Sequence, residues 1–130
     1  ALWIAQALYD NNEGGVLLTV DPSPWVQVEN FAKFPKLDAR IIFKQIRGDQ
    51  IETKKKIDFV FCDGLHEKEE VIKEMRHLLP MLSEHAIVVF HDCGDSNRFC
   101  DVNGAVQELG IKTVWIPTTN RIRIYEHSQC

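Results

Sequence analysis

The stretch Ile57–Cys93 constrains the fold more than any other part of the chain, because it combines two strand-like runs with a helical segment between them. Ile57–Cys62 is an apolar run broken only by Asp58, and such a run is typical of a central parallel strand covered on both faces. Ala86–Phe90 is a second run, rich in β-branched residues. The stretch therefore predicts a strand, a crossover and a second strand.

The segment between the two runs has the signature of an amphipathic helix. Glu67, Glu69 and Glu70 lie at its start, where negative charge faces the positive end of the helix macrodipole. Apolar residues then recur on one side at the helical period: Val71, Ile72, Met75, Leu78, Leu79 and Leu82. Such a helix lies flat on a sheet, so the unit is βαβ.

Each strand of this unit is followed closely by an aspartate, Asp63 after the first and Asp92 after the second. Crossover connections make parallel pairs, so both side chains should lie at one edge, where open α/β sheets bind their ligands. Adjacent strands lie roughly 4.8 Å apart, and two carboxylates so close repel each other unless a cation lies between them. The pair predicts a cation site, although turn formation and helix capping also favour aspartate at such positions.

The remaining segments extend the same alternation. We expect a helix that ends near Asn11, a helix that begins at Pro24 and stops before Pro35, and a helix from Asp101 or Asn103 to Leu109. The further expected strands are Val16–Val20, Ile41–Ile46, Ile111–Ile116 and Arg121–Tyr125, the last two forming an antiparallel hairpin. The pattern predicts one α/β domain over residues 1–130, with a doubly wound, mostly parallel sheet.

Composition narrows the function classes. A net charge of −4 and a basic run of only three lysines, Lys54 to Lys56, predict no nucleic-acid partner. No apolar run approaches the length of a membrane span, and no signal peptide is visible, so we expect no membrane association. The four cysteines show no CxxC spacing, which favours reduced thiols and a cytoplasmic location. A Cys93–Cys100 disulfide and a reactive thiol are the alternatives.

Four successive strands end close to an aspartate: Asp21, Asp49, Asp63 and Asp92. An acidic rim of this kind favours cationic or hydroxyl-rich small molecules and disfavours a phosphate site built from glycines and lysine.

The motifs VLLTVDP, FKQIRGD, IDFVFCDGLHEKEEV and IVVFHDC, followed by a helix and a hairpin, resemble class I S-adenosylmethionine-dependent methyltransferases. The nearest resemblance is to small-molecule and sugar O-methyltransferases whose fourth strand ends in a D-G-x-H-like signature and whose fifth ends in H-D. It implies a Rossmann-like fold, S-adenosylmethionine as cofactor, and methyl transfer to a hydroxyl of a small molecule or sugar. The resemblance also implies assistance by Mg²⁺ or another divalent cation.

By this resemblance, Asp21 holds the cofactor's ribose, Asp49 lies by its adenine, and Asp63 lines both the cofactor and the metal. His66 is the implied catalytic base, and Asp92 is the second implied metal ligand and catalytic residue. Cys93 occupies a place where related enzymes often have Asp or Asn, and a thiolate suits zinc better than magnesium.

The sequence departs from the family at its start, where relatives have a strand and a glycine-rich E-x-G-x-x-G-like turn. Here the first residues read as the helix that follows that strand, so the domain is expected to be truncated at its N-terminus. The strands at Val16 and Ile57 would then each have an open edge. A missing segment, direct pairing of the two strands, or a second chain, as a homo-oligomer or partner, would cover those edges.

Two other functions compete with methyl transfer. One is a non-catalytic remnant or interaction module of the same fold. The other is a metal-dependent hydrolase with His66, His91, Asp63 and Asp92 as ligands. Strand alternation disfavours the hydrolase, because His91 should face opposite to Asp92 if the pleat continues.

Overall fold

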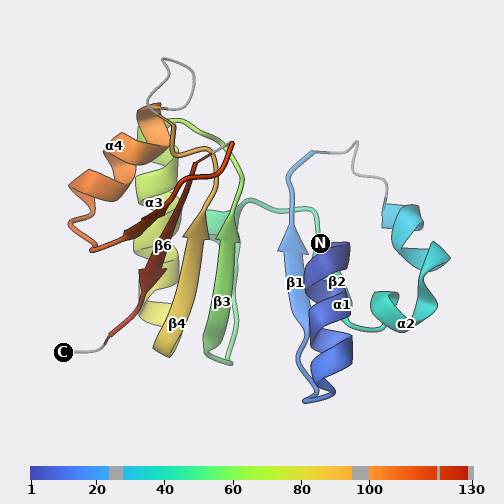
Figure 1. Ribbon diagram of the computed structural model, residues 1–130. Coiled ribbons are helices and arrows are strands. Elements are labelled where there is room, and N and C mark those ends of the chain that lie inside the picture. Colours follow the sequence, from blue (N-terminus) through green and yellow to red (C-terminus); the bar gives the residue numbers. More distant parts are fainter. Residues whose placement is uncertain (24–27, 95–99, 120, 129–130) are drawn as a thin grey trace. The chain divides into compact units, whose positions relative to one another are not determined.

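The computed structural model describes residues 1–23, 28–94, 100–119 and 121–128 (Figure 1). They form two compact units, Ala1–Gln50 and Ile51–Cys130. The six expected strands are all present, with helices between them, so the α/β class is confirmed. The two strands of the first unit pair with each other, and the four strands of the second unit form one sheet.

The first unit contains a helix and a parallel pair of strands. Helix α1 (Leu2–Asn11) ends as expected, because Asn12 adopts a left-handed conformation (φ 53°) and its N–H bonds to the carbonyl of Tyr9. Strands β1 (Leu17–Val20) and β2 (Ile41–Lys44) are parallel, with Leu17 opposite Ile41.

The connection between β1 and β2 differs from the expected single helix. Residues 24–27 lie outside the described residues. The chain then forms a 3-10 helix, η1 (Val28–Lys33), and a short helix α2 (Pro35–Asp38). Pro35 was expected to follow a helix, but it is the first residue of α2. Proline is suited to this position because the N–H that it lacks would have no hydrogen-bond partner in the first turn of a helix. After β2 comes the 3-10 turn η2 (Gly48–Gln50).

The second unit contains the predicted βαβ unit. Strands β3 (Ile57–Cys62) and β4 (Leu82–Phe90) are parallel neighbours, joined by helix α3 (Lys68–Leu78) and the 3-10 turn η3 (Leu79–Met81). The helix ends one turn earlier than the apolar stripe suggests, because Pro80 cannot continue it. Leu82 belongs to β4, where it is fully buried.

The hairpin at the end of the second unit is also confirmed. Helix α4 (Cys100–Glu108) is followed by Gly110, whose positive φ of 66° turns the chain toward the sheet. Strands β5 (Val114–Ile116) and β6 (Ile122–Glu126) are antiparallel, and β6 lies between β4 and β5.

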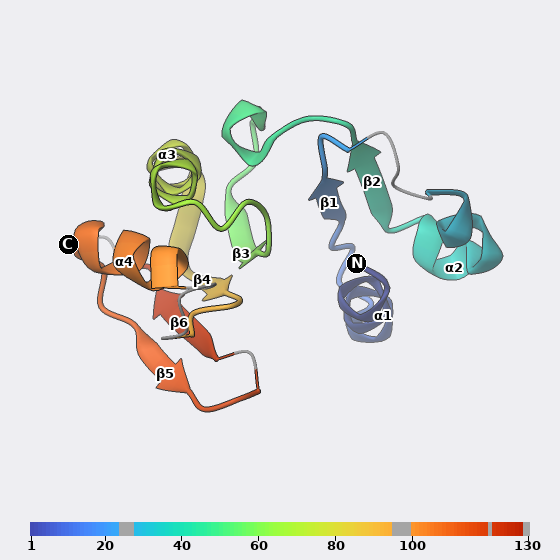
Figure 2. The ribbon, with the colours of Figure 1, turned by 90° about the horizontal axis from the view of Figure 1, so that it is seen from above.

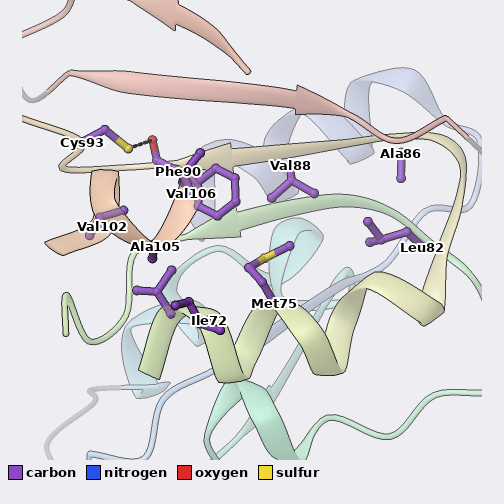
Figure 3. Packing of buried hydrophobic residues seen from close by; sticks show 11 residues of the cluster. Ile72, Met75, Leu82, Ala86, Val88, Phe90, Cys93, Val102, Ala105 and Val106 are labelled. Atoms are coloured by element: carbon purple, nitrogen blue, oxygen red, sulfur yellow. Dashed lines mark hydrogen bonds between the residues drawn. The ribbon is translucent and has the colours of Figure 1, made fainter. Parts of the chain in front are cut away.

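Helices α3 and α4 lie on the same face of the four-stranded sheet (Figure 2). Figure 3 shows the core between these helices and the sheet, in which Met75 of α3 and Phe90 of β4 are fully buried. The expectation that β3 is covered on both faces is wrong for this unit, since Phe59 and Phe61 are 42% and 43% exposed. The reason is that α3 and α4, the described helices of this unit, both lie on the opposite face of the sheet (Figure 2).

Among the helices within the described ranges, none is long and apolar enough to span a membrane.

Candidate functional site

The site lies at the carboxyl edge of the β3–β4 pair. The last residues of the two strands, Cys62 and Phe90, are register partners, so the segments that follow them begin side by side. One ligand atom from each of Asp63, His66 and Asp92 lies within 4.8 Å of the others. The predicted convergence of the two aspartates is therefore confirmed, and His66 joins them from the turn before α3.

The backbone at Asp92 decides which side chains meet. Asp92 has a φ of 54°, in the left-handed region, which aspartate tolerates better than most residues. This turn breaks the strand alternation after β4. The Nδ1 atom of His91 consequently lies 2.9 Å from Oδ1 of Asp63 and 3.3 Å from Oδ2 of Asp92. The prediction that His91 faces opposite to Asp92 is wrong, because it assumed a continuing pleat.

His66 contacts the same carboxylate from another direction. Its Nε2 atom is buried and lies 3.1 Å from Oδ2 of Asp92. The side chain is 34% exposed, so part of the ring faces solvent.

The donor set fits a divalent cation. Two carboxylates and an imidazole converge, and this mixture of oxygen and nitrogen donors suits manganese, iron or zinc at least as well as magnesium. The side chain of Asp92 is 13% exposed, whereas that of Asp63 is 48% exposed. The cluster is therefore anchored on the Asp92 side and open to small molecules on the Asp63 side.

A small hollow lies behind the cluster, lined by residues that include His66, His91, Glu74 and Met75. Its volume of about 20 Å³ suffices for a water molecule but not for a substrate. The hollow itself is therefore not the place of a substrate.

Cys93 takes no part in the cluster. Its side chain is fully buried in the core, where Sγ donates a hydrogen bond to the carbonyl of Phe90 at 3.5 Å. Burial raises the pKa of the Cys93 thiol, so it stays protonated and is a poor ligand. Cys62 and Cys93 are both free thiols, which excludes the Cys93–Cys100 disulfide from this structure.

The two remaining predicted site residues, Asp21 and Asp49, lie in the first unit. Both follow a strand of the parallel β1–β2 pair, and Asp21 donates its N–H to the carbonyl of Lys44 at 3.3 Å. The carboxylate of Asp21 accepts a hydrogen bond from the Ser23 N–H at 2.7 Å. Asp49 is 9% exposed and forms an ion pair with Nε of Arg47 at 3.1 Å. Their roles toward a cofactor stay predictions.

Of the site residues, the strand-end aspartates could be found from sequence, whereas the contact of His91 could not. No local pattern shows that Asp92 is left-handed. The one available signal is its residue type, since aspartate is among the few residues that adopt this conformation readily.

Comparison with solved structures finds the same fold in several methyltransferases. The apo structure of CalS11, a TDP-rhamnose 3'-O-methyltransferase of calicheamicin biosynthesis, matches with a TM-score of 0.72 and 14% identity, over 97% of this chain and 65% of that one. A putative O-methyltransferase from Klebsiella pneumoniae matches with a TM-score of 0.73 and 12% identity, over 98% of this chain and 67% of that one.

The N-methyltransferase NodS from Bradyrhizobium japonicum WM9 matches with a TM-score of 0.65 and 14% identity, over 88% of this chain and 74% of that one. A search of curated protein sequences finds no match. The family described as "Methyltransferase domain" matches residues 1–93, which include both β1–β2 and the βαβ unit with its cluster. This match shows that the chain belongs to the methyltransferase domain family, and its Rossmann-like α/β fold is that of class I S-adenosylmethionine-dependent methyltransferases.

Proposed function

We propose that the chain transfers a methyl group from S-adenosylmethionine to a hydroxyl of a small molecule or sugar, assisted by a divalent cation. The observation that carries the proposal is the convergence of Asp63, His66 and Asp92 within 4.8 Å at the carboxyl edge of β3 and β4. Such a cluster helps a hydroxyl acceptor more than a neutral amine, because a neutral amine is already nucleophilic whereas a hydroxyl must lose its proton. Two of the similar structures are named as O-methyltransferases, which supports this choice.

When bound, S-adenosylmethionine supplies an electrophilic methyl group, and a divalent cation supplies positive charge that favours the deprotonated hydroxyl. Asp63 and Asp92 are the residues that would hold the cation. Asp63 is half-exposed, so the acceptor can approach beside its carboxylate. Holding the acceptor hydroxyl at a fixed place accounts for much of the expected rate, because orientation replaces a random encounter.

His66 takes the hydroxyl proton in this proposal. We assign the proton transfer to Nδ1 of His66, because its other ring nitrogen, Nε2, lies 3.1 Å from Oδ2 of Asp92. The carboxylate of Asp92 stabilises the imidazolium that forms, and the ring then returns the proton to solvent through its exposed part. His66 and Asp92 would thus act together.

Asp21 and Asp49 would serve the cofactor. Asp21 directly follows β1, and Asp49 lies in the turn η2 after β2, so both come after the carboxyl ends of parallel strands, the edge at which open α/β sheets bind ligands. We assign the ribose hydroxyls to Asp21 and the adenine side to Asp49, as the sequence resemblance implies.

Calorimetry with S-adenosylmethionine and with its demethylated product tests the cofactor part of the proposal. We expect saturable binding of both, weakened at least tenfold in Asp21→Asn. Asp38→Asn, which alters an aspartate of α2 in the same unit, should leave binding unchanged. No heat from either compound would instead support the alternative of a non-catalytic module.

The metal-dependent hydrolase is the second candidate, since His91 does contact both carboxylates. The family match favours methyl transfer over it. Hydrolysis of phosphate or carboxylate esters by the Mn²⁺-loaded protein, without any methyl transfer, would favour the hydrolase over the methyltransferase.

A further inference from the structure

We propose that His91 is a positioning residue, which holds the carboxylates of Asp63 and Asp92 in the orientation that a cation requires. The inference rests on the cation site of the proposed function and names a residue that the sequence resemblance did not assign to it.

His91 contacts both carboxylates of the proposed cation site. A single ring atom, Nδ1 of His91, lies 2.9 Å from Oδ1 of Asp63 and 3.3 Å from Oδ2 of Asp92. The two carboxylates come from different strand ends and would separate by mutual repulsion. In the tautomer that carries the proton on Nδ1, this N–H lies within reach of both carboxylates and opposes their separation.

His91 is also held by contacts that do not involve the carboxylates. Its backbone N–H donates to the carbonyl of Cys62 at 3.1 Å, which ties it to β3. Its ring lies 5.9 Å from the ring of Phe61, measured between centroids, with a tilt of 40°. The side chain is only 22% exposed. The imidazole is therefore held by contacts other than those with the two carboxylates and can orient them.

A residue that orients metal-binding carboxylates affects how tightly the metal binds. Carboxylates that bind metal ions are themselves usually held by hydrogen bonds, and loss of such a partner typically weakens metal binding 10–100-fold. In this structure, one atom of His91, Nδ1, lies within hydrogen-bonding distance of both carboxylates. Removing its N–H should thus lower cation affinity without removing any ligand.

Titration of the full chain with Mn²⁺, followed by electron paramagnetic resonance, tests this inference without an activity assay. His91→Phe keeps a ring against Phe61 but has no N–H, so its Mn²⁺ affinity should fall roughly 10–100-fold. His91→Asn places an amide N–H near the position of Nδ1 and should bind Mn²⁺ within about threefold of the wild type. His85→Asn, a change at an exposed histidine of the same strand, should have no effect.

Thermal unfolding of each variant, followed by circular dichroism, shows whether the fold is retained. If His91→Phe does not fold, His91→Gln replaces it, because its amide reaches beyond the Nδ1 position and should also weaken binding. Wild-type affinity, or a tighter one, in the folded variant without the N–H overturns the positioning role alone. Absence of Mn²⁺ binding by the wild type overturns the cation site and this inference together.

Discussion

At the scale of single residues, the site depends on one backbone conformation. The left-handed turn at Asp92 sends its carboxylate and the His91 ring to the same edge, where a regular strand would have separated them. Sequence could place Asp63 and Asp92, because strand ends are readable from hydrophobic patterns. It could not place His91, because a positive φ at one residue leaves no periodic trace.

The conformation of Asp92 predicts how substitutions affect stability. Asp92→Ala should lower the free energy of unfolding by about 1 kcal/mol, since alanine is strained at a φ of 54°. Asp92→Asn should stay within about 0.5 kcal/mol of the wild type, because asparagine tolerates this region. Urea unfolding measures both. Equal stability of the two variants would contradict a strained backbone at this position.

The proposed proton acceptor gives a kinetic prediction. His66→Gln should lower kcat for methyl transfer roughly 10²–10⁴-fold, the usual contribution of a general base, and leave S-adenosylmethionine binding unchanged. Steady-state kinetics with labelled cofactor measures kcat, and calorimetry measures binding. An increase in acceptor KM with kcat retained would show that His66 only binds the acceptor.

At the scale of elements, the βαβ unit was the most predictable part of the chain. Its helix has an apolar stripe, and four stripe residues are buried as expected: Val71, Ile72, Met75 and Leu78. The boundaries were less predictable, because Pro80 ends the regular structure and β4 begins at Leu82, before His85 at a φ of 65°. An irregularity in a strand depends on its partner and has no sequence period.

Helix α3 supports the site by packing Met75 into the core. The side chain is fully buried and lies 3.7 Å from Cys62 between sulfur atoms. Met75→Ala should reduce the free energy of unfolding by about 2–5 kcal/mol, the usual cost of such a cavity. Arg76→Ala, at the exposed neighbouring position, should change it by less than about 0.5 kcal/mol. Comparable effects in the two variants would mean that α3 does not pack as described.

At the scale of the whole molecule, the order of the elements could be predicted, and so could the β3–β4 pair and the β5–β6 hairpin. The pairing of β6 with β4 could not. Pairing joins residues far apart in sequence, and hydrophobic pattern alone does not specify which strands become neighbours. The two pairs of strand ends nonetheless carry the predicted aspartates, two in each unit.

The buried thiols make the stability of the second unit depend on pH. Burial raises the pKa of both Cys62 and Cys93 above the ordinary value of 9.0, so above about pH 9 these thiols ionise more readily in the unfolded chain. Their contribution to stability should be complete below pH 9 and should decline above it. Urea unfolding at pH 7.5 to 10 measures this, and a weaker decline in Cys93→Ala is the expected control. An unchanged pH dependence in that variant would contradict the assignment.

The central claim is that the carboxyl edge shared by β3 and β4 carries the chemistry. Methyl transfer from labelled S-adenosylmethionine to a set of sugars, phenols and polyols, with Mn²⁺ or Mg²⁺ present, tests it most directly. Asp63→Asn should lower the rate at least 100-fold, whereas Asp58→Asn, a change at an exposed carboxylate near the other end of β3, should retain it. Equal rates in the two variants would contradict the account.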